Sequence, residues 1–251
     1  VKTGSGSVMG SLERATELAE TICDVARSAG TPGKALVTDM DQVLARNAGN
    51  ALEVAEVVEI LRGERSGARL LEVTRELAAE MLLAGGLHDD RNDAVAELDR
   101  RLHDGEAAQR FQAMVAHLGG PRDLLERAGE ILPRAPEVAP VVPERSGFVA
   151  AMDVHQIGMA VVELGGGRSR GDQKIDPAVG LEAMAGIGER VDADHPIARI
   201  HARSRGDAER AATRILAAVE LAEEPVEPPP LIHRRIGPGR AAPDASQETS
   251  P

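Results

Sequence analysis

Apolar residues recur at every third or fourth position through the first half of the chain, which is the spacing of one face of an α-helix. The clearest case is the segment 11–29, which ends at Gly30. The same spacing predicts further helices at about 50–62, 68–84, 90–103, 105–118 and 121–130. The apolar run at 34–38 is typical of a buried parallel strand. Helices arranged around such a strand predict an α/β fold.

The pattern changes near Pro133, where closely spaced prolines predict a linker. Beyond it, short apolar runs predict strands at 147–152, 174–176, 189–191 and 197–201, with helices at 154–164 and 207–223. This alternation predicts a second, smaller α+β domain. The expected organisation is a first domain over 1–133, a second over 134–223, and a Pro-rich, disordered tail over 224–251.

Composition narrows the range of partners. Aromatic residues make up 1% of the chain and the net charge is −12, so binding to nucleic-acid polymers is not expected. No segment approaches the ~18 consecutive apolar residues of a membrane span. The single cysteine, Cys23, lies on the apolar face of the first predicted helix and is expected to be a buried thiol. A lone thiol is typical of a cytoplasmic protein.

The chain begins with a glycine-punctuated turn, Val1-Lys2-Thr3-Gly4-Ser5-Gly6-Ser7-Val8-Met9. Such glycines let the backbone approach a ligand or a neighbouring segment closely. Lys-Thr-Gly also occurs in serine β-lactamases, but their Ser-x-x-Lys and Ser-Asp-Asn motifs are absent from this sequence. The P-loop pattern is absent as well. Taken alone, the turn is better explained as purely structural.

Two further motifs follow the turn along the chain, and they are informative in combination with it. They are Thr38-Asp39-Met40-Asp41-Gln42-Val43-Leu44 and Gly49-Asn50-Ala51-Leu52-Glu53-Val54. With the opening turn, they resemble the thymidine and pyrimidine-nucleoside phosphorylase family, and shorter matches continue to about residue 236. The resemblance implies the C-terminal part of the family's α/β domain, followed by its small C-terminal α+β domain.

The activity implied by this resemblance is transfer of a pentose from a pyrimidine to phosphate, as in the conversion of thymidine to thymine and 2-deoxyribose 1-phosphate. The implied partners are a pyrimidine nucleoside and phosphate, within a homodimer and without an organic cofactor. Two alternatives remain open. One is a catalytically silent structural or interaction module, and the other is a related AMP phosphorylase or phosphoribosyltransferase.

The family's phosphate loop, and the Arg and Ser-x-x-x-Lys that hold the pyrimidine, are expected upstream of Val1. The chain is therefore expected to be part of a longer enzyme and to be inactive alone. No catalytic residue is assigned within it. In particular, Lys2 is not given that role merely because it lies in the glycine-rich turn.

The resemblance carries two sets of site residues onto this chain. Val8 occupies the place of an apolar side chain, often Phe, that lies against the bound base, and its alternative is a core position. Some family members also bind a monovalent cation, usually potassium. Its ligands would be the main-chain carbonyls of Leu44 and Asn47 and the carboxylate of Glu56. The alternative for Glu56 is an ordinary exposed helix residue.

Overall fold

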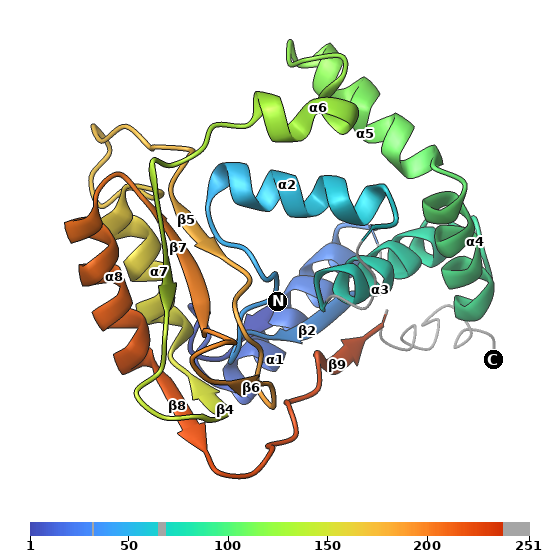
Figure 1. Cartoon of the computed structure of the whole chain (residues 1–251). Coiled ribbons are helices and arrows are strands. Elements are labelled where there is room, and N and C mark those ends of the chain that lie inside the picture. Colours follow the sequence, from blue (N-terminus) through green and yellow to red (C-terminus); the bar gives the residue numbers. More distant parts are fainter. Residues whose placement is uncertain (32, 65–68, 238–251) are drawn as a thin grey trace, which may run out of the picture.

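The first sheet brings together segments from both ends of the chain. In the computed structural model, which describes residues 1–31, 33–64 and 69–237, this sheet has the strand order β1 (Lys2–Thr3), β2 (Ala35–Asp39), β9 (Ile232–Ile236). β1 is parallel to β2, whereas β9 is antiparallel to it. Figure 1 shows the red β9 beside the blue β2, although almost the whole sequence separates them.

Helix α1 (Leu12–Ser28) connects β1 to β2 and covers the sheet. It begins at Ser11, whose side chain accepts a hydrogen bond from the amide of Arg14 at 3.4 Å, as an N-cap does. Its small residues Ala15 and Ala19 are fully buried and pack against Val37 of β2. The chain thus uses small helix residues, in place of aromatic ones, to bring the helix close to the sheet.

Five helices follow β2 and form an arc that leads away from the first sheet and back toward the second unit (Figure 1). They are α2 (Asn50–Leu61), α3 (Arg69–Ala84), α4 (Arg91–His103), α5 (Glu106–His117) and α6 (Leu124–Ile131). All five agree with the predicted positions to within a few residues. Helix α2 packs against β5 as well as α5 and α6, so it lies between these two helices and the second unit.

The second unit contains two antiparallel sheets and two helices. One sheet has the order β3 (Glu137–Val141), β7 (Ala198–Ala202), β5 (Gly180–Glu182), and the other has the order β6 (Arg190–Val191), β4 (Gly147–Met152), β8 (Val219–Ala222). Helices α7 (Val154–Leu164) and α8 (Arg205–Ala218) pack on each other. Aliphatic residues from all these parts form the largest hydrophobic core, which includes Leu164, Leu181, Ile200 and Ile215.

The segment before α2 is fastened to the second unit by backbone hydrogen bonds. Ala48 and Leu181 exchange two of them, with N···O distances of 2.9 and 2.7 Å. At this crossing, Gly49 and Gly180 let the two backbones touch, because a Cβ on Gly180 would lie 2.1 Å from the carbonyl oxygen of Ala48. The amide of Met184 also donates to the carbonyl of Arg46 at 2.8 Å. We call this set of contacts the glycine crossing.

Four predictions from the sequence are wrong in detail. The proline-rich linker contains strand β3, because its residues pair with β7. The last predicted helix ends at Ala218, and 219–222 form strand β8, which pairs with β4. Residues 174–176 are not a strand. The expected disorder from residue 224 does not hold for β9, which pairs with β2, while 238–251 lie outside the described residues.

The fold class itself is confirmed: helices and mixed sheets form an α/β arrangement, followed by an α+β unit. Cys23 is buried, as expected. None of the helices within the described ranges has the length and apolar character needed to cross a lipid bilayer.

Candidate functional site

The glycine-rich turn leaves the end of β1 and folds back on the segment that follows β2. Gly4 has φ +116°, and a Cβ there would lie 2.6 Å from Oδ1 of Asp41. The amide of Ser5 donates to the same oxygen at 2.7 Å, and the amide of Gly6 donates to the carbonyl of Met40 at 2.9 Å. Glycine at position 4 is therefore required by both backbone conformation and space. The first two family motifs form one structural unit here.

The same turn also contacts the second unit. The hydroxyl of Ser5 donates to the carbonyl of Met152 and accepts from the amide of Val154, both at 3.2 Å. Ser5 thus joins the turn to the end of β4 and the beginning of α7. The hydroxyl of Ser5 therefore has a structural role, because both of its hydrogen bonds are made to the protein itself.

Val8 lies at the outer part of this turn and is 97% exposed. The alternative of a core position is therefore wrong for Val8. A nearly fully exposed apolar side chain is available for contact with a bound base, and that role stays a prediction.

Glu56 differs clearly from the exposed position that is usual for a glutamate on a helix. It lies on α2 and is 0% exposed, so the interpretation as an exposed helix residue is wrong. Its carboxylate accepts from the backbone amide of Asn47 at 2.9 Å and from that of Arg46 at 3.2 Å. Hydrogen bonds to charged acceptors are stronger than those between neutral groups. Glu56 therefore fixes the loop that contains two of the three predicted cation ligands.

Asn47 is held from three directions. Besides the bond from its amide to Glu56, its side-chain nitrogen donates to the carbonyl of Leu52 at 3.1 Å. Its side-chain oxygen accepts from the amide of Ala183 at 3.0 Å. Asn47 thus links α2 to the second unit. An alanine at this place would make neither side-chain bond.

The positions predicted for a cation can be compared with this geometry. The amide of Ala48 points to Leu181, and because a trans peptide directs its C=O opposite to its N–H, the carbonyl of Asn47 points away from Leu181. A buried carboxylate with nearby main-chain carbonyls is a donor set that suits a hard cation. The residues thus fit such an ion in chemical type. Among the described residues no cluster of three or more His, Cys, Asp or Glu side chains offers a metal site.

A buried ion-pair cluster, which the sequence did not reveal, lies at the end of β2. The side chain of Asp39 is 0% exposed, and its carboxylate accepts from Nη2 of Arg69 at 3.0 Å. Nε2 of His233, on β9, lies 3.4 Å from its other oxygen. The cluster joins β2, β9 and the first turn of α3. Asp39 belonged to a recognised motif, but its two partners are distant in sequence.

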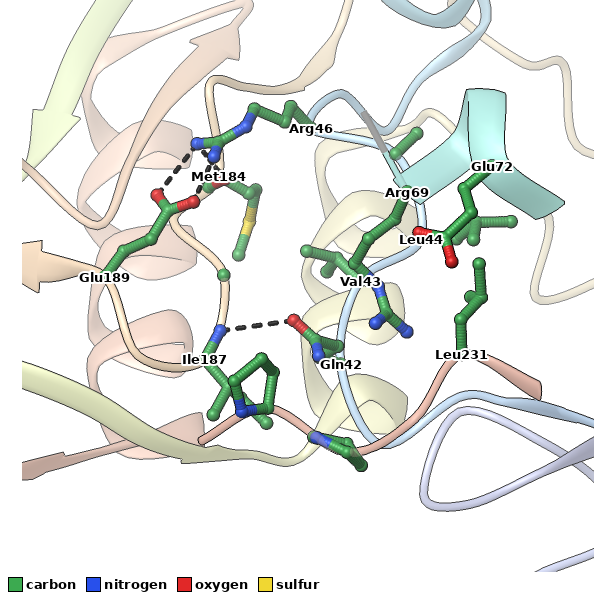
Figure 2. A pocket seen from close by; sticks show the side chains of 14 residues that line it. Gln42, Val43, Leu44, Arg46, Arg69, Glu72, Met184, Ile187, Glu189 and Leu231 are labelled. Carbon is green, nitrogen blue, oxygen red and sulfur yellow. Dashed lines mark hydrogen bonds and ion pairs between the residues drawn. The ribbon is translucent and has the colours of Figure 1, made fainter. Parts of the chain in front are cut away.

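A cavity of about 390 Å³ lies next to this cluster and to Leu44. Its walls come from the segment 42–46, the first turn of α3, the loop 184–189 and the segment 228–231. Figure 2 shows Arg46 paired with Glu189 on one side, and Arg69 and Gln42 also line the cavity. Met184, Ile187 and Leu231 are among the apolar side chains that line it, and Glu72 adds a carboxylate, so that polar and apolar atoms contribute about equally to its surface.

Two donors at this cavity lack hydrogen-bond partners among the described residues: Nε2 of Gln42 and Nε of Arg69. Gln42 is 1% exposed, and its oxygen is engaged, since it accepts from the amide of Ile187 at 3.2 Å. A buried donor without an acceptor costs about 1–3 kcal/mol. Nε of Arg75 and Nε of Arg91, which do not line the cavity, are buried and unpartnered in the same way within the described part of the chain.

Comparison with known protein families gives two matches. Residues 1–108 match the glycosyl transferase family α/β domain, and residues 148–222 match the pyrimidine nucleoside phosphorylase C-terminal domain. The two matches follow one another along the chain and together cover most of it.

The chain belongs to the pyrimidine-nucleoside phosphorylase family. The glycosyl transferase match contains the glycine-rich turn, the Asp39 motif and α2, so all four predicted site residues fall within it. The phosphorylase C-terminal match contains β4 through β8, and the glycine crossing joins the two matched regions.

Of the four predicted site residues of this family member, the structure brings Asn47 and Glu56 into direct contact. Leu44 lies in the same loop but lines the cavity, and Val8 lies apart on the glycine-rich turn. Gln42 and Asp39 were missed as possible binding or ion-pair residues. The sequence offered one signal for each: Asp39 is a carboxylate at the end of a predicted strand, and Gln42 is a glutamine beside apolar residues. Neither signal indicates which residue the side chain contacts.

Proposed function

We propose that this protein takes part in the phosphorolysis of pyrimidine nucleosides, converting thymidine and phosphate to thymine and 2-deoxyribose 1-phosphate. Membership of the pyrimidine-nucleoside phosphorylase family, through two matched regions in the family's order, carries this proposal. The family is one of glycosyl transferases of the nucleoside phosphorylase type, and phosphate and a pyrimidine nucleoside are the substrates that it implies.

The physical problem in this reaction is positive charge, which develops on the sugar as the pyrimidine leaves. Phosphate held on one face supplies the nucleophile and opposes that charge, while donors to the base oxygens stabilise the departing base. Closure around both substrates excludes water and favours phosphorolysis over hydrolysis. We propose that the exposed side chain of Val8 contacts the base.

We further propose that a potassium ion binds between the main-chain carbonyls of Leu44 and Asn47 and the carboxylate of Glu56. The position of Glu56 supports this, because its carboxylate lies against the backbone of Asn47, and carboxylate and main-chain carbonyl oxygens are the ligands that a hard cation prefers. The ion would act through the loop that Glu56 holds. Homodimeric assembly, which the resemblance implies, and a cytoplasmic location, which the lone thiol indicates, stay predictions.

The phosphate-loop and Ser-x-x-x-Lys patterns of the family do not occur in these 251 residues. We therefore expect the 251-residue chain alone to release no thymine from thymidine in the presence of phosphate, and a protein that also contains those motifs to do so. The release of thymine can be followed by its ultraviolet absorbance, with thymidine, uridine and AMP compared as substrates.

The outcomes separate the alternatives. Turnover by the 251-residue chain alone would contradict the assignment of the essential groups to other polypeptide. A motif-containing protein that uses AMP and not thymidine would identify a nucleotide phosphorylase. A protein that uses none of the three would indicate a structural or interaction module.

A further inference from the structure

Another cavity lies within the arc of helices that follows β2, and none of the four predicted site residues lines it. Its volume is about 270 Å³, and its walls come from the last residue of α2 and from α3, α4 and α5 (Figure 1). We call it the arc cavity. Its walls lie within residues 61–110, so it is separate from the cavity beside Gln42, whose walls include the loop 184–189.

Small side chains leave this space open. Ala78 of α3 and Ala107 of α5 line it, together with the leucines Leu61, Leu98 and Leu102. These leucines are only partly buried, and they belong neither to the core of the second unit nor to the core beneath α1. Aromatic residues make up 1% of the chain, so the sequence supplies few of the large rings that fill such gaps between helices. The apolar walls therefore lack the van der Waals contacts of a filled core.

The charged side chains at the arc cavity are engaged with other charged groups. Arg75 pairs with Asp99, and Arg101 pairs with Glu106, while Arg110 is exposed to solvent. Nε of Arg75, which has no hydrogen-bond partner among the described residues, exposes almost no surface and so does not face the cavity. The arginines contribute mainly the carbon atoms of their side chains, and almost the whole surface of the cavity is apolar.

A surface of this kind selects for a neutral, apolar ligand. A charged group that enters would lose its hydration without gaining a partner. A ring that carries carbonyl and N–H groups would likewise leave them unsatisfied, at a cost of about 1–3 kcal/mol for each group. A hydrocarbon has no such cost. An engineered apolar cavity of about 150 Å³ binds benzene, so a cavity of about 270 Å³ has room for a somewhat larger body.

The ion pairs at the arc cavity also favour a small molecule over a protein partner. The side chains of Arg101 and Glu106 are 50% and 43% exposed, so their charged ends are in contact with water. A protein surface that covered the cavity would have to remove these charges from water, which is costly. A small molecule that enters between the helices would leave the ion pairs hydrated.

We propose that the arc cavity binds a neutral, apolar small molecule, about as large as a substituted benzene ring or a short hydrocarbon chain. Its body would pack against Ala78, Leu98 and Ala107 and would join α2, α3, α4 and α5. This inference does not depend on the proposed phosphorolysis, because the residues and the ligand class are different.

The test uses toluene as the probe and the whole 251-residue chain, labelled with ¹³C in its leucine methyl groups. We expect toluene to shift the methyl resonances of Leu98 in a saturable way. The methyl groups of Leu118, which is 81% exposed just after α5, should not move. The variants Leu98→Ile and Leu118→Ile assign these resonances.

The chemistry of the ligand is tested with benzoate and benzylamine, which add a negative and a positive charge to the same ring. Both should bind at least about tenfold more weakly than toluene, because their charges would be removed from water. The inference is overturned if toluene does not move Leu98, if it moves Leu118 equally, or if either charged compound binds as tightly as toluene.

A matched pair of variants tests the place of binding. Ala78→Leu fills part of the cavity and should weaken toluene binding about tenfold. Ala96→Leu, at an exposed position on α4 that does not line the cavity, should leave the affinity within about twofold. Equal affinities in the two variants would overturn the inference. If Ala78→Leu does not fold, the ligand series on the unmodified chain decides the matter.

Discussion

Among single residues, Glu56 shows how strongly burial changes the role of a side chain. Glu53, Glu56 and Glu59 recur at every third position of α2, yet only Glu56 is buried. Its carboxylate organises the amides of Arg46 and Asn47, which belong to a loop joined to the second unit. One buried charge therefore influences both α2 and the glycine crossing.

We expect Glu56→Gln to lower the free energy of unfolding by about 1–3 kcal/mol, because the amide replaces an acceptor oxygen with a donor that faces a backbone N–H. Urea unfolding measures this change. Glu126→Gln, at an exposed position on α6, is the control and should change stability by less than about 0.5 kcal/mol.

The same two variants test the proposed cation. Replacing sodium chloride with potassium chloride at constant ionic strength should stabilise the unmodified chain and Glu56→Gln unequally, with the larger gain in the unmodified chain. Equal responses in all three proteins would argue against potassium at Glu56. A Glu56→Gln variant as stable as Glu126→Gln would contradict the structural role as well.

The candidate site was only partly predictable from residue patterns. Family motifs located the loop that contains Leu44 and Asn47 and the carboxylate of Glu56, and the structure shows a hydrogen bond between the last two, while their role as cation ligands stays a prediction. The sequence could not reveal that Arg69 and His233 meet Asp39, since nothing local couples these positions. It also could not distinguish an exposed Val8 from a buried one, because a single apolar residue in a glycine-rich turn has no periodic context.

At the scale of elements, α3 is joined to its neighbours by an ion-pair network. Glu76 pairs with Arg91 of α4 and with Arg235 of β9. Glu80, one turn later, pairs with Arg235 at 3.0 Å and with Lys34 at 3.2 Å. The network secures β9, whose own sequence is polar, against a helix from the first half of the chain.

Burial alone would raise the pKa of Glu76, but hydrogen bonds from Arg91 and Arg235 outweigh it and lower the pKa below the ordinary value of 4.5. A lowered folded-state pKa stabilises the fold fully above about pH 4.5, and this contribution is lost as the pH falls through the folded-state value. We expect Glu76→Gln to cost about 1 kcal/mol at pH 7 and to cost nothing at strongly acidic pH.

Urea unfolding between pH 7 and pH 3 measures this dependence. Glu17→Gln, at an exposed position on α1, should follow the unmodified chain throughout. A stability difference between Glu76→Gln and the unmodified chain that stays constant with pH would show that Glu76 acts by packing and not by charge.

Helices were more predictable than strands in this chain, for a physical reason. A helix forms its hydrogen bonds within its own segment, so the apolar period of α1 or α4 suffices to predict it. Strands β3, β8 and β9 form their bonds with partners remote in sequence. In β3, Pro140 also suggested a linker, although proline is tolerated at an edge of a sheet, where β3 lies.

Across the whole molecule, the glycine crossing sets how the two family-matched regions meet. A Cβ at position 180 would collide with the carbonyl of Ala48, and one at position 49 would lie 2.4 Å from the carbonyl of Val179. The backbones can approach this closely only without side chains. The cavity beside Gln42 depends on this approach, because residues on both sides of it form its walls.

We expect Gly180→Ala to destabilise the protein by about 1–3 kcal/mol, because the methyl group forces the two backbones apart. Amide hydrogen exchange at Ala48 and Leu181 should accelerate, since these residues exchange the two hydrogen bonds of the crossing. Gly158→Ala is a suitable control: its Cβ would enter open space on α7, and alanine should stabilise that helix by about 0.5–1 kcal/mol. Unchanged stability and exchange in Gly180→Ala would refute the proposed strain.

The position of β9 also bears on how the protein is made. During synthesis, β1, α1 and β2 leave the ribosome before β9 does, so β2 lacks this neighbour until residues 232–236 have been translated. One side of a buried strand thus stays open while nearly two hundred further residues are added. Open strand edges invite mispairing, so the nascent chain requires protection, by a chaperone or by its own helices, until the last strand arrives.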